Sequence, residues 1–241
     1  MQHYHKQDKN INLCAPRAYY VPFAKGQQKS YNRQDSERFF SLNGIWNITA
    51  YESVYDAEGF WEKSGEKQIP VPSCVQYFGY DFFQYTNFYS PFPYNPPFIP
   101  EKNPCYHFSR SFEYQKKDEK VYLVTEGVDS CFYLYINGKE VGFSQISHKL
   151  GEFDITPYLK DGENKIDMLV VKWCFGSYLE CQDKWRFTGI FRDIYLLKRP
   201  EEHIIDYTIT TDIDGENGVV TFIPASDIPT TLRLLGRAKF A

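Results

Sequence analysis

The chain has 241 residues, with 27 Lys and Arg against 31 Asp and Glu, so its formal net charge at pH 7 is −4. This balance excludes a nucleic-acid-binding role built on clustered basic residues, and a hydrophobic share of 42% excludes a disordered chain. No apolar run approaches the ~20 residues that span a bilayer, and the polar start of the chain has no secretory signal. We therefore expect a globular, cytoplasmic protein without nucleic-acid or membrane partners.

The cysteine pattern favours free thiols. None of the six cysteines forms a Cys-x-x-Cys pair, so zinc spacing is absent and small apolar side chains are expected. They are Cys14, Cys74, Cys105, Cys131, Cys174 and Cys181.

Short strands separated by turns are predicted from residue 42 to about residue 200. Asn137-Gly138 joins two of them and favours a type I′ hairpin turn, in which both central residues need a positive φ. Nowhere do apolar residues keep helical spacing for even about 12 residues. We therefore predict an all-β, jelly-roll sandwich. The expected strands are residues 45–51, 120–124, 131–136, 139–144, 165–173 and 192–197.

Two stretches resist strand assignment. Residues 91–100 contain five prolines, which remove hydrogen-bond donors and restrict φ, so a rigid extended loop is expected there. Residues 175–186 form a polar and aromatic loop between two expected strands. Loops held on a rigid sandwich often carry binding residues.

A second domain is predicted to begin after Pro200. Strands are expected at residues 203–213, 219–222 and 230–235, too few for an immunoglobulin-like sandwich. We therefore divide the chain into an N-terminal arm (1–40), a jelly roll (41–200) and the start of an incomplete immunoglobulin-like domain (201–241), which either is truncated or packs on the first domain.

The residues by themselves demonstrate no catalysis. No nucleophile elbow, phosphate loop or zinc-binding helix occurs, and the five histidines are expected on the surface or in turns. Two carboxylate pairs are present, Glu152 with Asp154 and Glu180 with Asp183, but Asp154 is expected to cap a turn. The abundant Tyr and Phe fit either core packing or the stacking of sugars.

Several ordered motifs resemble glycoside hydrolase family 2. Ser41–Trp46 resembles the entry strand of that family, and the block from Glu152 to Leu159 falls in its order. The Asn95-Pro96-Pro97 loop and the Glu180-x-Gln182-Asp183-x-Trp185-Arg186 block resemble the β-galactosidases within it. The likeness covers residues 17–200.

The resemblance implies a multidomain, retaining enzyme that hydrolyses terminal β-D-galactosides. Its jelly-roll sugar-binding domain precedes an immunoglobulin-like domain and a TIM barrel that carries both catalytic glutamates, so no catalytic residue is expected in this chain. Asn95 is implied to contact galactose, and Asp183 to contact the galactose 6-hydroxyl and a sodium ion. Mg²⁺ is expected only in the full-length enzyme, as are the remaining domains and homo-oligomer contacts.

This chain departs from the family near the implied sodium loop. Cys174-Phe175-Gly176 replaces Ser-Asp-Gly, and Cys181 replaces an aspartate, so two carboxylates are missing. Two other interpretations stay open: a free-standing carbohydrate-binding module, and an oligomerisation scaffold whose N-terminal arm reaches a neighbouring subunit.

Overall fold

A computed structural model describes residues 10–239, except for residues 64, 66, 88, 181, 215–216 and 227–233. The predictions for residues 1–9, for Cys181 and for most of a strand at residues 230–235 lie outside the described residues. Within them, no helix is long and apolar enough to cross a membrane. The five described cysteines are free thiols, and four of them are buried.

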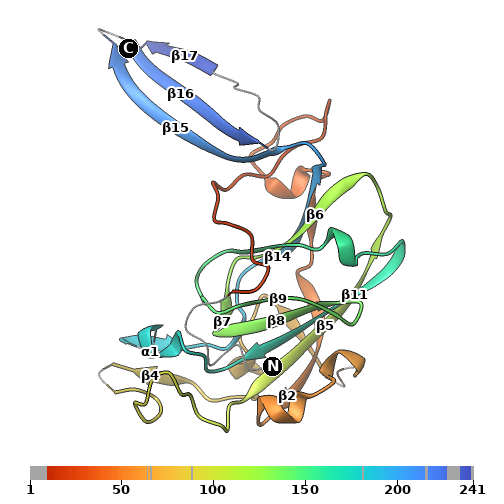
Figure 1. The fold of residues 1–241 in the computed structure, drawn as a ribbon, viewed down its shortest axis with the longest axis vertical. Coiled ribbons are helices and arrows are strands. Elements are labelled where there is room, and N and C mark those ends of the chain that lie inside the picture. The colour runs from red at the N-terminus through yellow and green to blue at the C-terminus, as the bar shows by residue number, and fades with distance from the viewer. Residues whose placement is uncertain are drawn as a thin grey trace.

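The predicted β-sandwich is confirmed, and it is a jelly roll of two antiparallel sheets (Figure 1). Each sheet combines strands from distant parts of the chain, as a jelly roll requires. The smaller sheet has the order β1 (Phe39–Ser41), β14 (Ile194–Pro200), β6 (Glu119–Thr125) and β10 (Gly151–Asp154). The larger sheet has the order β3 (Lys67–Val71), β2 (Gly44–Tyr51), β5 (Cys105–Tyr114), β11 (Gly162–Val171), β8 (Cys131–Ile136) and β9 (Lys139–Ser144).

The larger sheet is buried on both faces. Along β8, Phe132 and Leu134 face the core between the two sheets, whereas Tyr133 and Tyr135 belong to a second core on the opposite face. Strand side chains alternate between faces, so a strand buried on both sides reads as a continuous apolar run. Residues of the proline-rich loop are also buried in this second core, so the core helps to position that loop.

The hairpin between β8 and β9 forms as predicted. Asn137 has a φ of 52° and Gly138 a φ of 76°, the positive values that a type I′ turn needs. The Asn137 side chain also accepts from the backbone N–H of Lys165 at 3.0 Å and donates to the Tyr158 carbonyl at 3.0 Å. The turn is therefore tied to the neighbouring strand β11.

Parts of the predicted element order are wrong. The segment expected as a loop, residues 175–186, contains helix α1 (Ser177–Glu180) and strand β12 (Lys184–Arg186). Strand β5, which pairs with β2 and β11, had not been predicted. His107, expected on the surface or in a turn, is instead fully buried in β5. The Asp167 carboxylate of β11 lies 2.8 Å from its Nε2 atom and gives the buried imidazole a polar partner.

Short elements complete the sandwich. Two small antiparallel sheets pair β4 (Gln84–Thr86) with β12 and β7 (Val128–Asp129) with β13 (Gly189–Ile190). The 3₁₀ helices of the described residues are η2 (Arg33–Asp35), η3 (Val54–Ala57), η4 (Phe60–Glu62), η5 (Val75–Phe78) and η6 (Thr156–Tyr158).

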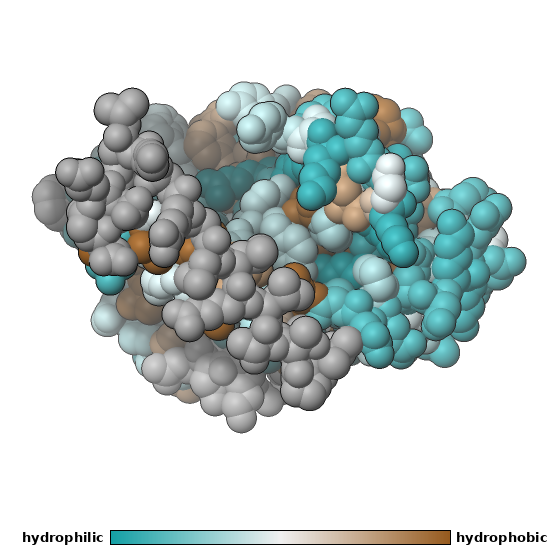
Figure 2. Space-filling model, turned by 90° about the horizontal axis from the view of Figure 1, so that it is seen from above, coloured by the Kyte–Doolittle hydropathy of each residue, from teal (hydrophilic) through white to brown (hydrophobic). Residues whose placement is uncertain are grey.

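A three-stranded antiparallel sheet follows the sandwich and extends from its top in Figure 1. It contains β15 (Ile204–Asp214), β16 (Asn217–Ser226) and β17 (Leu234–Lys239). Ile209 and Ile213 of β15 are exposed, and the view from this end shows hydrophobic side chains among hydrophilic ones (Figure 2). That these strands begin an immunoglobulin-like domain stays a prediction.

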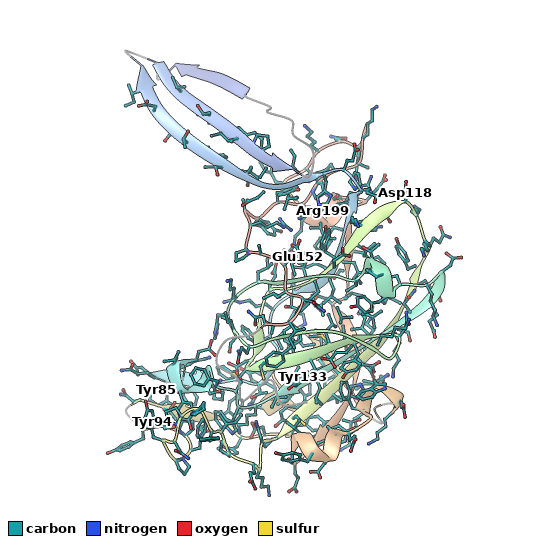
Figure 3. All side chains as sticks on the ribbon, in the orientation of Figure 1. Tyr85, Tyr94, Asp118, Tyr133, Glu152 and Arg199 are labelled. Carbon is teal, nitrogen blue, oxygen red and sulfur yellow. The ribbon has the colours of Figure 1, made fainter. Side chains whose placement is uncertain are left out.

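The described part of the N-terminal arm packs against its own chain. The Arg17 guanidinium pairs with the Glu152 carboxylate at 2.5 Å, and Glu152 lies beside Arg199 in the sandwich (Figure 3). The backbone N–H of Ala18 donates to Asp206 of β15 at 2.7 Å. The arm thus joins the jelly roll to the sheet that follows it.

Candidate functional site

The proline-rich loop that carries Asn95 is anchored at two points. Phe92 and Ile99 are buried in the second core, on either side of Asn95. The Phe92 ring packs edge-on against Trp173, with ring centroids 5.1 Å apart, and against Tyr178 at the same separation. Two buried side chains thereby hold the ends of a segment that has no strand pairing.

Tyr178 of α1 closes the turn in which Asn95 lies. The backbone N–H of Phe98 donates to the Asn95 carbonyl at 2.9 Å, which defines the turn. The Tyr178 hydroxyl donates to the Phe98 carbonyl and accepts from the Asn95 N–H at 3.3 Å. Asn95 itself is exposed, so its side chain reaches solvent from a turn that is held in place.

Asp183 lies between α1 and β12 in a left-handed conformation, with a φ of 51°. Aspartate tolerates this region better than most residues, because its short polar side chain can bond locally. The Asp183 carboxylate accepts a hydrogen bond from the Tyr85 hydroxyl, and this bond raises the pKa of Tyr85 above its usual value. The contact follows from strand register, because Trp185 of β12 lies opposite Tyr85 of β4.

Asp129 pairs with the two basic side chains that follow Asp183 closely in the chain. The Asp129 carboxylate is buried and pairs with Lys184 at 3.0 Å and with Arg186 at 2.7 Å. Asp129 lies on β7, which pairs with β13 just after this segment. Asp183 therefore stays exposed, and its carboxylate accepts a hydrogen bond from the Tyr85 hydroxyl.

Asn95 and Asp183 lie at the same end of the sandwich. Their chain neighbours Tyr94 and Gln182 line one hollow of about 320 Å³, which we call the tyrosine hollow. The other residues that line it are Asn87, Tyr89, Ser90, Ser177 and Tyr178. Figure 3 shows Tyr94 and Tyr85, the partner of Asp183, close together at this end. The hollow offers hydroxyl and amide groups beside aromatic rings, the mixture that binds sugars.

Part of this site could have been found in the sequence. Asn95 and Asp183 were marked by the motifs that carry them, but only the pairing of β4 with β12 shows that the Tyr85 hydroxyl reaches Asp183. No sequence pattern marked the roles of Tyr178 and Asp129. Both act through partners more than 50 positions away in the chain.

The other carboxylates have structural roles. Asp154 accepts from the N–H of Thr156 at 2.9 Å, the turn cap that the sequence predicted. Glu152 pairs with Arg17, and Glu180 accepts from the Ser147 hydroxyl at 2.6 Å. None of these three reaches the tyrosine hollow in the described part of the chain.

The described residues at this end of the sandwich offer one carboxylate that suits the sodium ion implied by the resemblance. Oxygen ligands suit a hard cation, and the exposed Asp183 carboxylate is one of them. Among the described residues, no group of three or more His, Cys, Asp or Glu side chains could hold a metal ion. Further ligands for sodium at Asp183 would thus have to be carbonyls, waters or groups from elsewhere.

A comparison with family models matches residues 39–200 to the glycosyl hydrolases family 2, sugar binding domain. That range contains every strand of the sandwich, Asn95 and Asp183. The chain belongs to glycosyl hydrolase family 2. This family assignment agrees with the motifs read from the sequence.

Two curated relatives of this family 2 chain carry the name β-galactosidase. The protein from Actinobacillus pleuropneumoniae is 42% identical over 215 residues, which is 87% of this chain and 21% of that protein. The protein from Staphylococcus xylosus is 39% identical over 218 residues, which is 89% of this chain and 22% of that protein. The chain thus spans about a fifth of the length of these relatives.

Solved structures show the same fold at low sequence identity. A β-glucuronidase from an uncultured Clostridium species aligns with a TM-score of 0.60 at 18% identity, over 88% of this chain and 36% of that one. The Ruminococcus gnavus β-glucuronidase aligns with a TM-score of 0.61 at 17% identity, over 80% of this chain and 34% of that one.

Proposed function

We propose that this chain is the N-terminal, sugar-contacting part of a retaining, cytoplasmic β-galactosidase. The observation that carries the proposal is the similarity of 87% of the chain to a protein named β-galactosidase. The position of Asn95 and Asp183 at one end of the sandwich supports the proposal, because both side chains are exposed there and a sugar can reach them. The catalytic carboxylates are expected on the part of such enzymes that this chain does not span.

In this proposal each of the two residues has a defined task. The Asn95 amide both donates and accepts, which suits a sugar hydroxyl. The Asp183 carboxylate accepts from the galactose 6-hydroxyl, and it keeps an oxygen for a sodium ion when one is bound. The Tyr85 hydroxyl orients that carboxylate, and Tyr178 orients the backbone of Asn95.

The test is Asp183→Asn in a longer protein that contains this chain and hydrolyses galactosides. We expect a lower kcat/KM, with a larger loss for a galactoside than for the corresponding 6-deoxygalactoside, because a site built for a hydroxyl loses most with the substrate that has it. Asp154→Asn, at the turn cap, is the matched control and leaves the ratio of the two substrates unchanged. Equal losses for both substrates would make Asp183 a structural residue.

A further inference from the structure

The N-terminal arm covers the outer face of the smaller sheet, where Val21 packs against a buried cluster that includes Val124 and Leu197. Glu152 lies opposite Val124 in the strand register, and Arg199 follows Leu197 by two positions, so both charged side chains share this face. Glu152 is 5% exposed and Arg199 is 1% exposed. Figure 3 shows these two residues in the part of the jelly roll nearest the sheet β15–β17. The arm therefore closes over two opposite charges.

Two arginines share the Glu152 carboxylate unequally. Arg17 of the arm donates from its Nε atom, 3.1 Å from both carboxylate oxygens, and from Nη2 at 2.5 Å. The Arg199 Nη1 atom lies 3.7 Å from Oε1, which is beyond hydrogen-bond distance. Glu152 therefore accepts its hydrogen bonds from the arm and makes only a long ionic contact with Arg199.

Arg199 has unsatisfied donors while the arm is in place. Its Nε and Nη2 atoms are buried and have no hydrogen-bond partner among the described residues. These two atoms form an edge of the guanidinium that can bind a carboxylate through two parallel hydrogen bonds. The Tyr20 and Tyr122 rings lie 5.0 and 5.1 Å from the guanidinium, but ring faces offer no acceptor for that edge. Because a buried donor without an acceptor costs free energy, Arg199 opposes the closed position of the arm.

The same part of the arm attaches the jelly roll to the sheet that follows it. Directly after Arg17, the Ala18 N–H donates to the Asp206 carboxylate of β15 at 2.7 Å. The Tyr20 hydroxyl donates to the carbonyl of Ile204, the first residue of β15. A movement that releases Arg17 from Glu152 would therefore also release the contacts with β15.

We propose that residues 17–20 are a releasable strap between the jelly roll and the sheet β15–β17. In the closed arrangement, which the structure shows, Arg17 binds Glu152. In the open arrangement Glu152 binds the free edge of Arg199, and the strap leaves β15. Arg199 keeps the two arrangements close in free energy, because its donors are satisfied only in the open one. The inference goes beyond the proposed galactosidase function, because it needs neither a substrate nor a residue of the sugar site.

Hydrogen exchange of the Ala18 amide in the 241-residue chain measures the opening, because this amide is bonded to Asp206 in the closed arrangement. Arg199→Met removes the unsatisfied donors and keeps an unbranched apolar side chain beneath the arm. We expect this variant to slow the exchange of Ala18 about tenfold, since closure no longer buries unmatched donors. Arg17→Ala frees Glu152 for Arg199 and should accelerate the exchange about tenfold or more.

The matched control is Arg38→Met. Arg38 pairs with Glu119 at 2.9 Å, outside the strap, so its loss should leave the exchange of Ala18 unchanged. The amide of Leu169, in the middle of the larger sheet, reports whether each variant is folded. Faster exchange of Ala18 in Arg199→Met would overturn the proposal, because Arg199 would then support the arm. Unchanged exchange would overturn it as well, because Arg199 would then play no part in opening.

Nitrogen-15 relaxation tests the joining role of the strap and needs only Arg17→Ala. In the parent chain we expect one rotational correlation time for the jelly roll and the sheet β15–β17, and in the variant two different times. A single common time in Arg17→Ala, together with fast exchange of Ala18, would refute the strap as the link between the two parts. A longer protein without galactosidase activity would refute the proposed function but would leave both measurements standing.

Discussion

Removing the Asp129 carboxylate should destabilise the jelly roll by about 3 kcal/mol. Asp129 is 1% exposed, and the Arg186 side chain that pairs with it is 3% exposed. Breaking a buried ion pair from one side costs about 3–5 kcal/mol, because the remaining charge loses its compensation. We take the lower end of this range, since the Arg186 guanidinium stays 5.0 Å above the Trp173 ring.

Thermal unfolding and urea unfolding, each followed by circular dichroism, measure the effect of Asp129→Ala. A loss of this size shifts Tm down by about 6–12 °C in a chain of about this length, and it lowers the urea midpoint without changing the m-value. The matched control is Glu52→Ala, which breaks the exposed pair of Glu52 with Lys102 and should change stability by less than about 0.5 kcal/mol. If both variants lose the same stability, the ion pair of Asp129 contributes nothing beyond a surface contact.

Three further predictions follow from the site. The purified 241-residue chain should not hydrolyse a chromogenic galactoside, because the retaining reaction needs two carboxylates on either side of one sugar; turnover free of host enzyme would contradict this. Asp183→Asn should let Tyr85 ionise at lower pH, because the carboxylate that holds its pKa up is gone, and NMR of ¹³C-labelled tyrosine measures that pKa; an unchanged value would mean that the hydrogen bond is absent in solution. In an active longer protein, Tyr178→Phe should raise KM for galactosides a few-fold with little change in kcat, since Asn95 and Phe98 lose the hydroxyl that closes their turn; an unchanged KM would separate Asn95 from substrate binding.

Local sequence patterns predicted much of the sandwich. The Asn137-Gly138 turn and its two strands form at the predicted residues, because a type I′ turn and alternating side chains depend on nearest neighbours. The proline-rich loop has no strand pairing within residues 91–100, as the missing donors required. Helix α1 escaped prediction because four residues are too short for any helical periodicity.

The exposed end was predictable only in part. The motifs around Asn95 and Asp183 marked these residues, and their loops do lie at one end of the molecule. What the residues do there remains a prediction. Their positioning residues, Tyr85 and Tyr178, could not be recognised, because each acts through a hydrogen bond to a residue more than 80 positions away.

The sequence by itself determined the all-β class, the principal turn and the family, because these depend on local spacing and on motif order. Only the tertiary structure decided which carboxylate takes the basic side chains of β12. The pairing of β7 with β13 brings Asp129 into the interior beside Lys184 and Arg186, where a buried cation requires a counter-charge. Asp183 is thereby left at the surface, where its carboxylate accepts a hydrogen bond from the Tyr85 hydroxyl.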